Sequence, residues 1–159
     1  MHIWTIEKWC QVYDNINVRS GLRLRCDKTV DEEVKRACKE FCSWLRTEYY
    51  FPVRIPIYLK SSYKIKASDG EMVCATFFEP TDRKHEPYIR ISTGDYLEML
   101  HEDGKDNALA AIIGTIAHEL THYFQWINDI QLTEIGEERQ ANAYAGFILD
   151  EYKGTREHP

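Results

Sequence analysis

Two histidines and a glutamate lie close together inside the most apolar stretch of the chain. His118, Glu119 and His122 fall within residues 112–129, IIGTIAHELTHYFQWIND, where most of the other side chains are apolar. Burying titratable groups in such surroundings is costly unless something pairs with them. A metal ion would pair with both imidazoles at once, so the pattern indicates a metal centre.

The spacing of these residues suits zinc if the stretch is helical. Four residues of helix turn about 400° and rise about 6 Å, so His118 and His122 project from one face and can both reach a single ion. Zinc takes imidazole nitrogens at about 2 Å. Glu119 lies about 100° further round, where it can reach a metal-bound water without being a ligand. The alternative is a pair of core histidines satisfied by backbone or carboxylate partners.

A catalytic zinc site needs a third protein ligand, with the fourth position left to water. A metzincin would have glycine at 125 and histidine at 128, whereas this chain has Gln125 and Asn128. The only later histidine is His158, far along the chain. Carboxylates remain, and the last predicted helix offers Glu134, Glu137 and Glu138.

Helical geometry favours Glu138 among these three carboxylates. At about 100° per residue, Glu138 falls inside the inward stripe that contains Ala141, Ala145 and Leu149, whereas Glu137 lies about 100° away at the edge of that stripe. The two alanines also allow this helix to approach the helix that carries the histidines. We therefore expect Glu138 as the third ligand, with Glu137 as the alternative.

The elements that must position these residues are predicted from periodicity and from turn residues. Thr29 followed by Glu32 has the pattern of a capping box, and the apolar positions after it repeat at helical spacing until Pro52. Three strand candidates follow, which we expect to form a small antiparallel sheet: residues 55–59, 72–78 and 88–92. Further helices are expected from about 95 to 101, from about 106, and from 133 to 152.

The predicted fold class is therefore α+β, with a helix, a small sheet of about three strands and two helices packed together. No repeat, low-complexity segment or Pro-rich linker divides the chain, so residues 1–159 are expected to form a single domain. Residues 1–28 remain an unassigned N-terminal extension. The alternation around Ser20 and Gly21 predicts a hairpin there.

Composition narrows the classes of partner. The apolar content of 43% and charged content of 29% are ordinary for a soluble globular protein. The net charge of −6 argues against a nucleic-acid partner, since binding phosphates needs a positive face. A local basic strip, formed by Arg19, Arg23, Arg25 and Lys28, is interpreted as a solvated face.

The location expected from the sequence is cytoplasmic. Glu7 and Lys8 interrupt the apolar start too early for a signal peptide, and the longest apolar run contains two histidines and a glutamate, so we expect no membrane span. An odd count of five cysteines indicates reduced thiols. Cys38 and Cys42 share a helix face and are expected to be buried and inert.

The two predicted site motifs together resemble those of a known family. HELTH at 118–122, followed by ERQANAYA at 138–145, is similar to the gluzincin metallopeptidases of the small ImmA/IrrE-type group, whose second motif reads E-x-x-A-N-x-[FY]-A. The two motifs cover the last two helices, and the helix-then-sheet order before them agrees in outline. The resemblance implies a minimal zincin-like fold.

The resemblance also implies roles for individual residues. One zinc ion per chain would be bound by His118, His122 and Glu138, with Glu119 as the general base of a zinc metalloendopeptidase. The strand at 88–92, YIRIS, would form the upper rim of the cleft and pair with an extended peptide. Members often cleave a specific regulatory protein, so a repressor-like substrate is expected, with no membrane or nucleic-acid partner.

Two other functions stay open at this point. The same ligands could serve a zinc-containing protein-interaction module with little proteolytic activity, because no oxyanion-stabilising residue is evident. Tyr144 is predicted to point about 120° away from the Glu138 direction. A SprT-like protease acting on DNA-associated proteins is the second alternative, suggested by HELTHYFQW at 118–126. The acidic charge and the lack of a downstream histidine ligand weigh against it.

Overall fold

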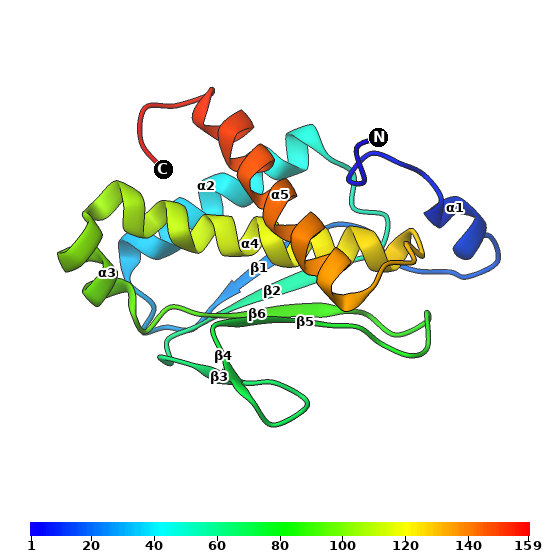
Figure 1. Ribbon diagram of the computed structural model, residues 1–159, viewed down its shortest axis with the longest axis horizontal. Helices are drawn as coiled ribbons and strands as arrows, with labels where there is room; N and C mark the ends of the chain where they lie inside the picture. Colours follow the sequence, from blue (N-terminus) through cyan, green and yellow to red (C-terminus); the bar gives the residue numbers. More distant parts are fainter.

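The computed structural model describes residues 1–159 as five helices and a small mixed sheet, with a separate two-stranded hairpin (Figure 1). The elements in chain order are α1 (Trp9–Val12), β1 (Leu22–Cys26), α2 (Glu32–Glu48), β2 (Ile55–Lys60), β3 (Ile65–Lys66), β4 (Met72–Val73), β5 (Ala75–Phe78), β6 (Tyr88–Ser92), α3 (Tyr96–Asp103), α4 (Lys105–Ile127) and α5 (Glu134–Lys153). The predicted α+β class is confirmed.

The sheet is mixed, so the prediction of an antiparallel sheet was wrong. Its strand order is β1-β2-β6-β5; β1, β2 and β6 are parallel, and only β5 is antiparallel to its neighbour. The predicted hairpin around Ser20 and Gly21 included the residues of β1, but the crossover in which α2 connects two parallel strands was not predicted. Such a crossover needs a dozen or more residues, which α2 supplies.

The predicted strand at 72–78 is divided in two. Met72 and Val73 pair with β3 in the separate hairpin, whose turn contains Gly70 at a φ of +90°. Residues 75–78 pair with β6 as the edge of the main sheet, so the chain changes sheets at Cys74. This division makes β5 one of the two edge strands of the main sheet, with β1 at the other edge.

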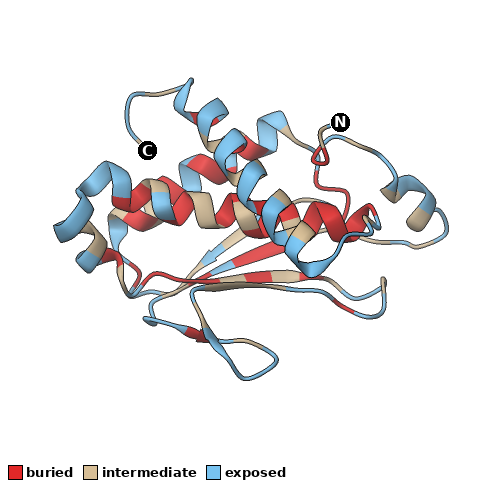
Figure 2. Cartoon of the chain, in the orientation of Figure 1, coloured by how far each residue is buried: buried red, intermediate tan, exposed pale blue.

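Helices α2 and α4 lie on one side of the sheet, and the β3–β4 hairpin projects from the other side (Figure 1). The alternate residues Leu22, Ile57 and Ile89 turn toward the helices and are fully buried. One hydrophobic core of 32 residues joins these strands to α2, α4 and α5. Figure 2 shows that its buried positions concentrate along α4.

Helix α2 begins two residues later than the capping-box prediction. Its N-cap is Asp31, whose side chain accepts a hydrogen bond from the backbone N–H of Glu33, so Thr29 is not the cap. Either residue type can cap a helix, and spacing alone did not separate them. Cys38 and Cys42 are fully buried on this helix, as expected, and burial raises the pKa of both thiols.

The first 28 residues belong to the same core, and the hairpin predicted at Ser20 and Gly21 was wrong. Gly21 has a φ of +110° and leads into β1, which pairs in parallel with β2. Ile3 and Trp4 are buried against α4, where the Trp4 indole N–H donates to Thr121 Oγ1 at 3.2 Å. The segment therefore supports the helix that carries the two histidines.

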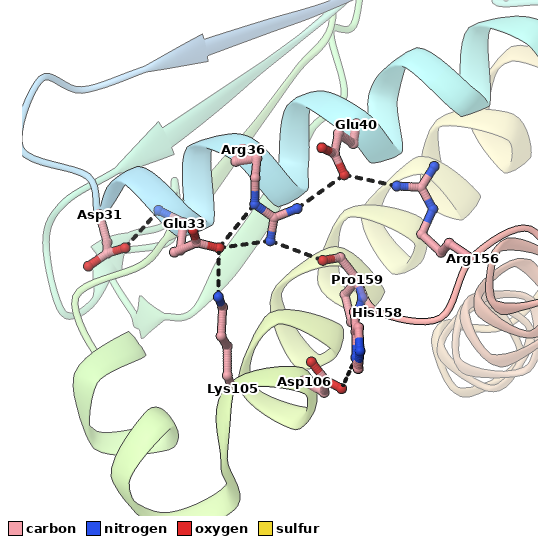
Figure 3. Close-up of polar contacts among 9 residues, drawn as sticks. All are labelled: Asp31, Glu33, Arg36, Glu40, Lys105, Asp106, Arg156, His158 and Pro159. Carbon is pink, nitrogen blue, oxygen red and sulfur yellow. Dashed lines mark hydrogen bonds and ion pairs between the residues drawn. The ribbon is translucent and has the colours of Figure 1, made fainter.

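Residues 154–159 cross from the end of α5 toward α2 and the start of α4. Figure 3 shows a network of charged and polar groups that holds them there, formed by Glu33, Arg36, Glu40, Lys105, Asp106, Arg156, His158 and Pro159. Most of these groups are partly exposed, so each ion pair contributes little by itself. Together they connect residues 154–159 to α2 and to the start of α4.

None of the helices combines the length and the apolar character needed to cross a membrane.

Candidate metal centre

Helix α4 fixes the two histidines in the middle of the molecule. Its 23 residues include 14 that are buried, because this helix packs between the sheet and α5. His118 and His122 are on the side that faces α5, with 20% and 17% of their side chains exposed. They are therefore partly accessible to solvent, although the helix around them is part of the core.

Helix α5 brings Glu138 to the same place. Thr133 caps this helix by accepting from the Gly136 N–H, and Glu138 lies one turn into it. The helix crosses close to α4, since a side chain at Gly114 would meet Leu149 at 3.0 Å. Ala141 is fully buried in the contact, in agreement with the predicted small-residue approach.

The ligand atoms of His118, His122 and Glu138 converge. The two Nε2 atoms are 3.2 Å apart, His118 Nε2 is 3.3 Å from Glu138 Oε2, and His122 Nε2 is 3.1 Å from Glu138 Oε1. Three ligands around a tetrahedral zinc at 2.0–2.1 Å would be separated by about 3.3 Å. The three side chains therefore fit a zinc ion with small adjustments.

The other candidate third ligands lie elsewhere. His118, His122 and Glu138 form the one group of ligand atoms close enough to hold a metal ion, and neither Glu134 nor Glu137 belongs to it. His158 pairs with Asp106 at 2.7 Å. The structure thus places Glu138 where the helical angles predicted it.

Gln125 links the histidine helix to the Glu138 helix, a role that the sequence reading did not assign. The His122 Nδ1–H donates to Gln125 Oε1 at 2.8 Å, and Gln125 Nε2 donates to Glu137 O and to Gln140 Oε1, both at 3.0 Å. Glu137 O can only accept, so the Gln125 Nε2 group must face it and Gln125 Oε1 must face His122. Because Oε1 can only accept, Nδ1 of His122 carries the proton. Its Nε2 lone pair is then directed at the site.

Glu119 is buried and has no hydrogen-bond or ion-pair partner, although it lines the same cleft as the histidines. Burial, reinforced by the nearby charge of Glu138, raises the pKa of Glu119 to about 8 in the metal-free chain. A carboxyl group with this pKa can take up and release a proton near neutrality. A cation at the adjacent ligands would favour its charged form.

Burial also lowers the pKa of His118, and the neighbouring His122 acts in the same direction. Glu138 and Asn142 oppose the shift. A neutral imidazole is the form that binds metal, so the environment of His118 favours the ligand state. Asn142 comes from the second sequence motif, and its position beside His118 gives that motif a physical role.

A cleft of about 980 Å³ contains the metal-binding group, and its two ends differ. Toward the start of α4 and the end of α5 it is lined by small or uncharged residues: Ala110, Ala111, Gly114, Thr115, Gly146 and Leu149. Beyond His122 it is lined by Glu79, Arg83, Asp129, Glu134 and Glu137. Arg83 is the one basic residue there, and it already pairs with Asp129 at 3.8 Å.

Strand β5 forms the wall of the cleft opposite the helices, so the prediction that YIRIS forms the rim was wrong. Residues 74–77 line the cleft, whereas β6 (Tyr88–Ser92) is paired on both sides and lies inside the sheet. The outer edge of β5 has no strand partner. The family resemblance pointed to β6 because it is the last strand before the histidine helix, whereas in the sheet order β6 lies between β2 and β5.

The three tyrosines of α4 and α5, including Tyr144, have structural roles. Tyr144 accepts from Ile3 N–H and donates to Met1 O, and Tyr123 donates to Val53 O. Tyr152 is buried against Phe41. None of them lines the cleft; Asn142 and Gln125 do, but both amide N–H groups of Gln125 already donate to Glu137 O and Gln140 Oε1.

Comparisons of the chain with protein-family models, with curated proteins and with solved structures find no match.

Proposed function

We propose that this chain is a zinc-dependent metallopeptidase of the gluzincin type, with a minimal zincin-like fold, that hydrolyses peptide bonds of a protein substrate. The observation that carries the proposal is the convergence of His118, His122 and Glu138, with ligand atoms 3.1–3.3 Å apart, beside the buried carboxyl group of Glu119. Two imidazoles, one carboxylate and a neighbouring base are the components of a hydrolytic zinc site.

The proposed reaction divides the work between the metal and the chain. Bound zinc would make its water acidic near neutral pH and would polarise the peptide carbonyl. Glu119 accepts the proton of the attacking water and then delivers it to the leaving amine. Gln125 holds His122 in the tautomer that presents Nε2.

The substrate would bind as an extended segment along β5. The free edge of this strand faces the cleft and offers backbone N–H and C=O groups to a peptide main chain. Glu79, Glu134 and Glu137 have no ion-pair partners at the end of the cleft beyond His122, so basic side chains are favoured there. A regulatory protein of repressor-like type remains the proposed substrate.

The test is zinc-dependent cleavage of a mixed synthetic peptide library, with products identified by mass spectrometry. We expect cleavage by the zinc-loaded protein, no cleavage by Glu119→Gln, and enrichment of Lys or Arg on one side of the cut. Absence of any cleavage product from the zinc-loaded protein would contradict the proposed peptidase activity. Equal cleavage by Glu119→Gln would remove the proposed role of Glu119.

A zinc-containing interaction module remains the second candidate, because no tyrosine lines the cleft and its only histidines are the two candidate ligands. In that case the metal would organise α4 and α5 for binding a partner. Glu119→Gln separates the two functions, since it would leave partner binding intact while removing hydrolysis. The SprT-like alternative loses support, because the one histidine downstream of His122 is held by Asp106.

A further inference from the structure

The side of the main sheet that faces away from α2 and α4 is not covered by any helix (Figure 1). Strand alternation and register show which residues it carries. Tyr58 lies opposite Arg25 on β1 and opposite Arg90 on β6, and Arg90 lies opposite Thr76 on β5. The alternate positions, such as Ile57 and Ile89, are buried against the helices.

Three aromatic rings form a continuous cluster on this open face. Phe78 stacks on Tyr88 with ring centroids 4.8 Å apart, and Tyr58 meets Tyr88 edge-on at 6.2 Å. Tyr58 and Phe78 remain 37% and 38% exposed, unlike the aromatic residues of the core. The cluster therefore presents ring surface to solvent from three neighbouring strands.

The charge of this face is opposite to that of the whole chain. The four strands of the sheet contain Arg23, Arg25, Lys60 and Arg90 and not one aspartate or glutamate, although the chain has 26 of these acids. Lys60 pairs with Asp27 at 3.5 Å, but the three arginines have no carboxylate partner. The net charge of −6, which argued against nucleic acid, therefore does not describe this surface.

Arg25 and Arg90 are placed on either side of Tyr58 by the strand register. The Arg90 guanidinium donates to Lys66 O at 2.9 Å and lies 6.0 Å from the Tyr88 ring, while its Nε is buried without a partner. Arg25 contacts only the carbonyl of Leu24. Arg25 is therefore an exposed cation beside the Tyr58 ring, and Arg90 is a half-buried cation beside the Tyr88 ring.

We propose that the open face of the sheet, formed by Arg23, Arg25, Tyr58, Phe78, Tyr88 and Arg90, binds single-stranded nucleic acid without strong sequence preference. Exposed aromatic rings on a four-stranded sheet stack unpaired bases, and flanking arginines neutralise phosphates. An acidic protein partner would be attracted by the arginines but would not need the cluster of three rings. The face lies on the opposite side of the sheet from the core, so this binding is independent of the metal centre.

The test measures fluorescence anisotropy of a labelled 20-nucleotide single strand with the full chain, at 50 to 200 mM salt. We expect single-strand binding that weakens with salt, with a slope of about −2 in log affinity against log salt if three phosphates are neutralised. Arg25→Glu should reduce both the affinity and the slope. Tyr58→Ala should weaken binding about 5- to 150-fold with little change in slope, and Tyr58→Phe should restore it.

Matched controls use residues away from the face. Lys8→Glu and Tyr50→Ala change an exposed cation and an exposed tyrosine elsewhere, and should leave the affinity unchanged. Circular dichroism confirms that each variant is folded, and Glu138→Ala should bind the strand as the parent does. No binding at 50 mM salt, or equal binding of duplex DNA or polyglutamate with no effect of Tyr58→Ala, would overturn the proposal.

Discussion

Helices α4 and α5 each contribute to the candidate metal centre, but they do so from very different environments. Helix α4 has 14 of its 23 residues buried, whereas α5 has three of 20. The histidine side chains on α4 are about one-fifth exposed, whereas Glu138 on α5 is 54% exposed. Figure 2 shows the same contrast along the two helices.

This difference shows which half of the site is prearranged. His118, Glu119 and His122 are positioned by the core, and Gln125 holds the outer nitrogen of His122. Glu138 depends on the docking of α5, which rests on Ala141, Ile148 and Tyr152 and on the Gln125 bonds. Perturbations of α4 should therefore alter chemistry and folding, whereas perturbations of α5 should alter mainly metal affinity.

The largest expected effect tests the chemistry of α4. Glu119→Gln removes the proton acceptor without removing a ligand, so peptide hydrolysis should fall by about 10²- to 10⁴-fold. The zinc content should remain that of the parent, as measured by elemental analysis beside the peptide-library assay. Loss of zinc in this variant would instead make Glu119 part of the metal-binding set.

The burial of Glu119 should also make the stability of the metal-free protein depend on pH. Its pKa is raised from 4.5 to about 8, so between these values the folded chain holds a proton that the unfolded chain lacks. The free energy of unfolding should then fall as the pH rises through this window, by a few kcal/mol at most, since each pKa unit corresponds to about 1.4 kcal/mol.

Urea unfolding at pH 5 and pH 8, with zinc removed from both proteins, measures this effect against Glu119→Gln. The variant cannot ionise at this position, so its stability should fall less over the same interval. Parallel pH profiles for the two proteins would show that Glu119 is not desolvated as described.

Removing the Gln125 link between α4 and α5 should have an intermediate effect, on zinc affinity. Gln125→Leu removes the acceptor from His122 and both donors to α5, and should weaken zinc binding by about 10- to 100-fold. Gln140→Leu removes a neighbouring group that does not touch His122 and should have less effect. Gln125→Glu keeps the acceptor and should retain more affinity than Gln125→Leu.

Competition with a zinc chelator gives these affinities, and the ring nitrogens of His122 can be followed by NMR in the metal-free protein. Gln125→Leu should release the fixed tautomer. Parental zinc affinity together with an unchanged tautomer in this variant would show that the link does not position His122.

The smallest expected effect is on the free energy of unfolding, and it tests the packing of the N-terminal segment against α4. Trp4→Phe removes the hydrogen bond to Thr121 and part of the ring surface stacked on Phe124, and should lower the free energy of unfolding by about 1–2 kcal/mol. Phe147→Leu on the exposed side of α5 should change it by less than about 0.5 kcal/mol. If urea unfolding shows that Trp4→Phe and Phe147→Leu lower the free energy of unfolding equally, the contrast between α4 and α5 is contradicted.

The same contrast explains what could be predicted from the sequence. The apolar periodicity of residues 112–127 made α4 evident, and helical geometry then placed His118, His122 and Glu138 on facing surfaces, where the structure has them. The metal itself and the hydrolytic role of Glu119 remain predictions. Local signals were sufficient here because each helix carries its own periodicity and its own turn residues.

Features that depend on distant contacts were not predicted. The parallel pairing of β1 with β2 is set by where α2 returns the chain, and alternation around Gly21 looked equally like a hairpin. The choice of β5 rather than β6 as the edge follows from sheet order. Gln125 looked like a departure from another motif, since its three bonds become visible only when α5 is docked.

The most direct test of the metal centre is the zinc content and zinc affinity of the parent protein, Glu138→Ala and the matched control Glu137→Ala. We predict about one zinc per chain in the parent and in Glu137→Ala, with weakened or lost zinc in Glu138→Ala. Full zinc affinity in Glu138→Ala would place the third ligand elsewhere. No zinc in the parent, even after zinc is added back, would mean that His118 and His122 are core residues without a metal.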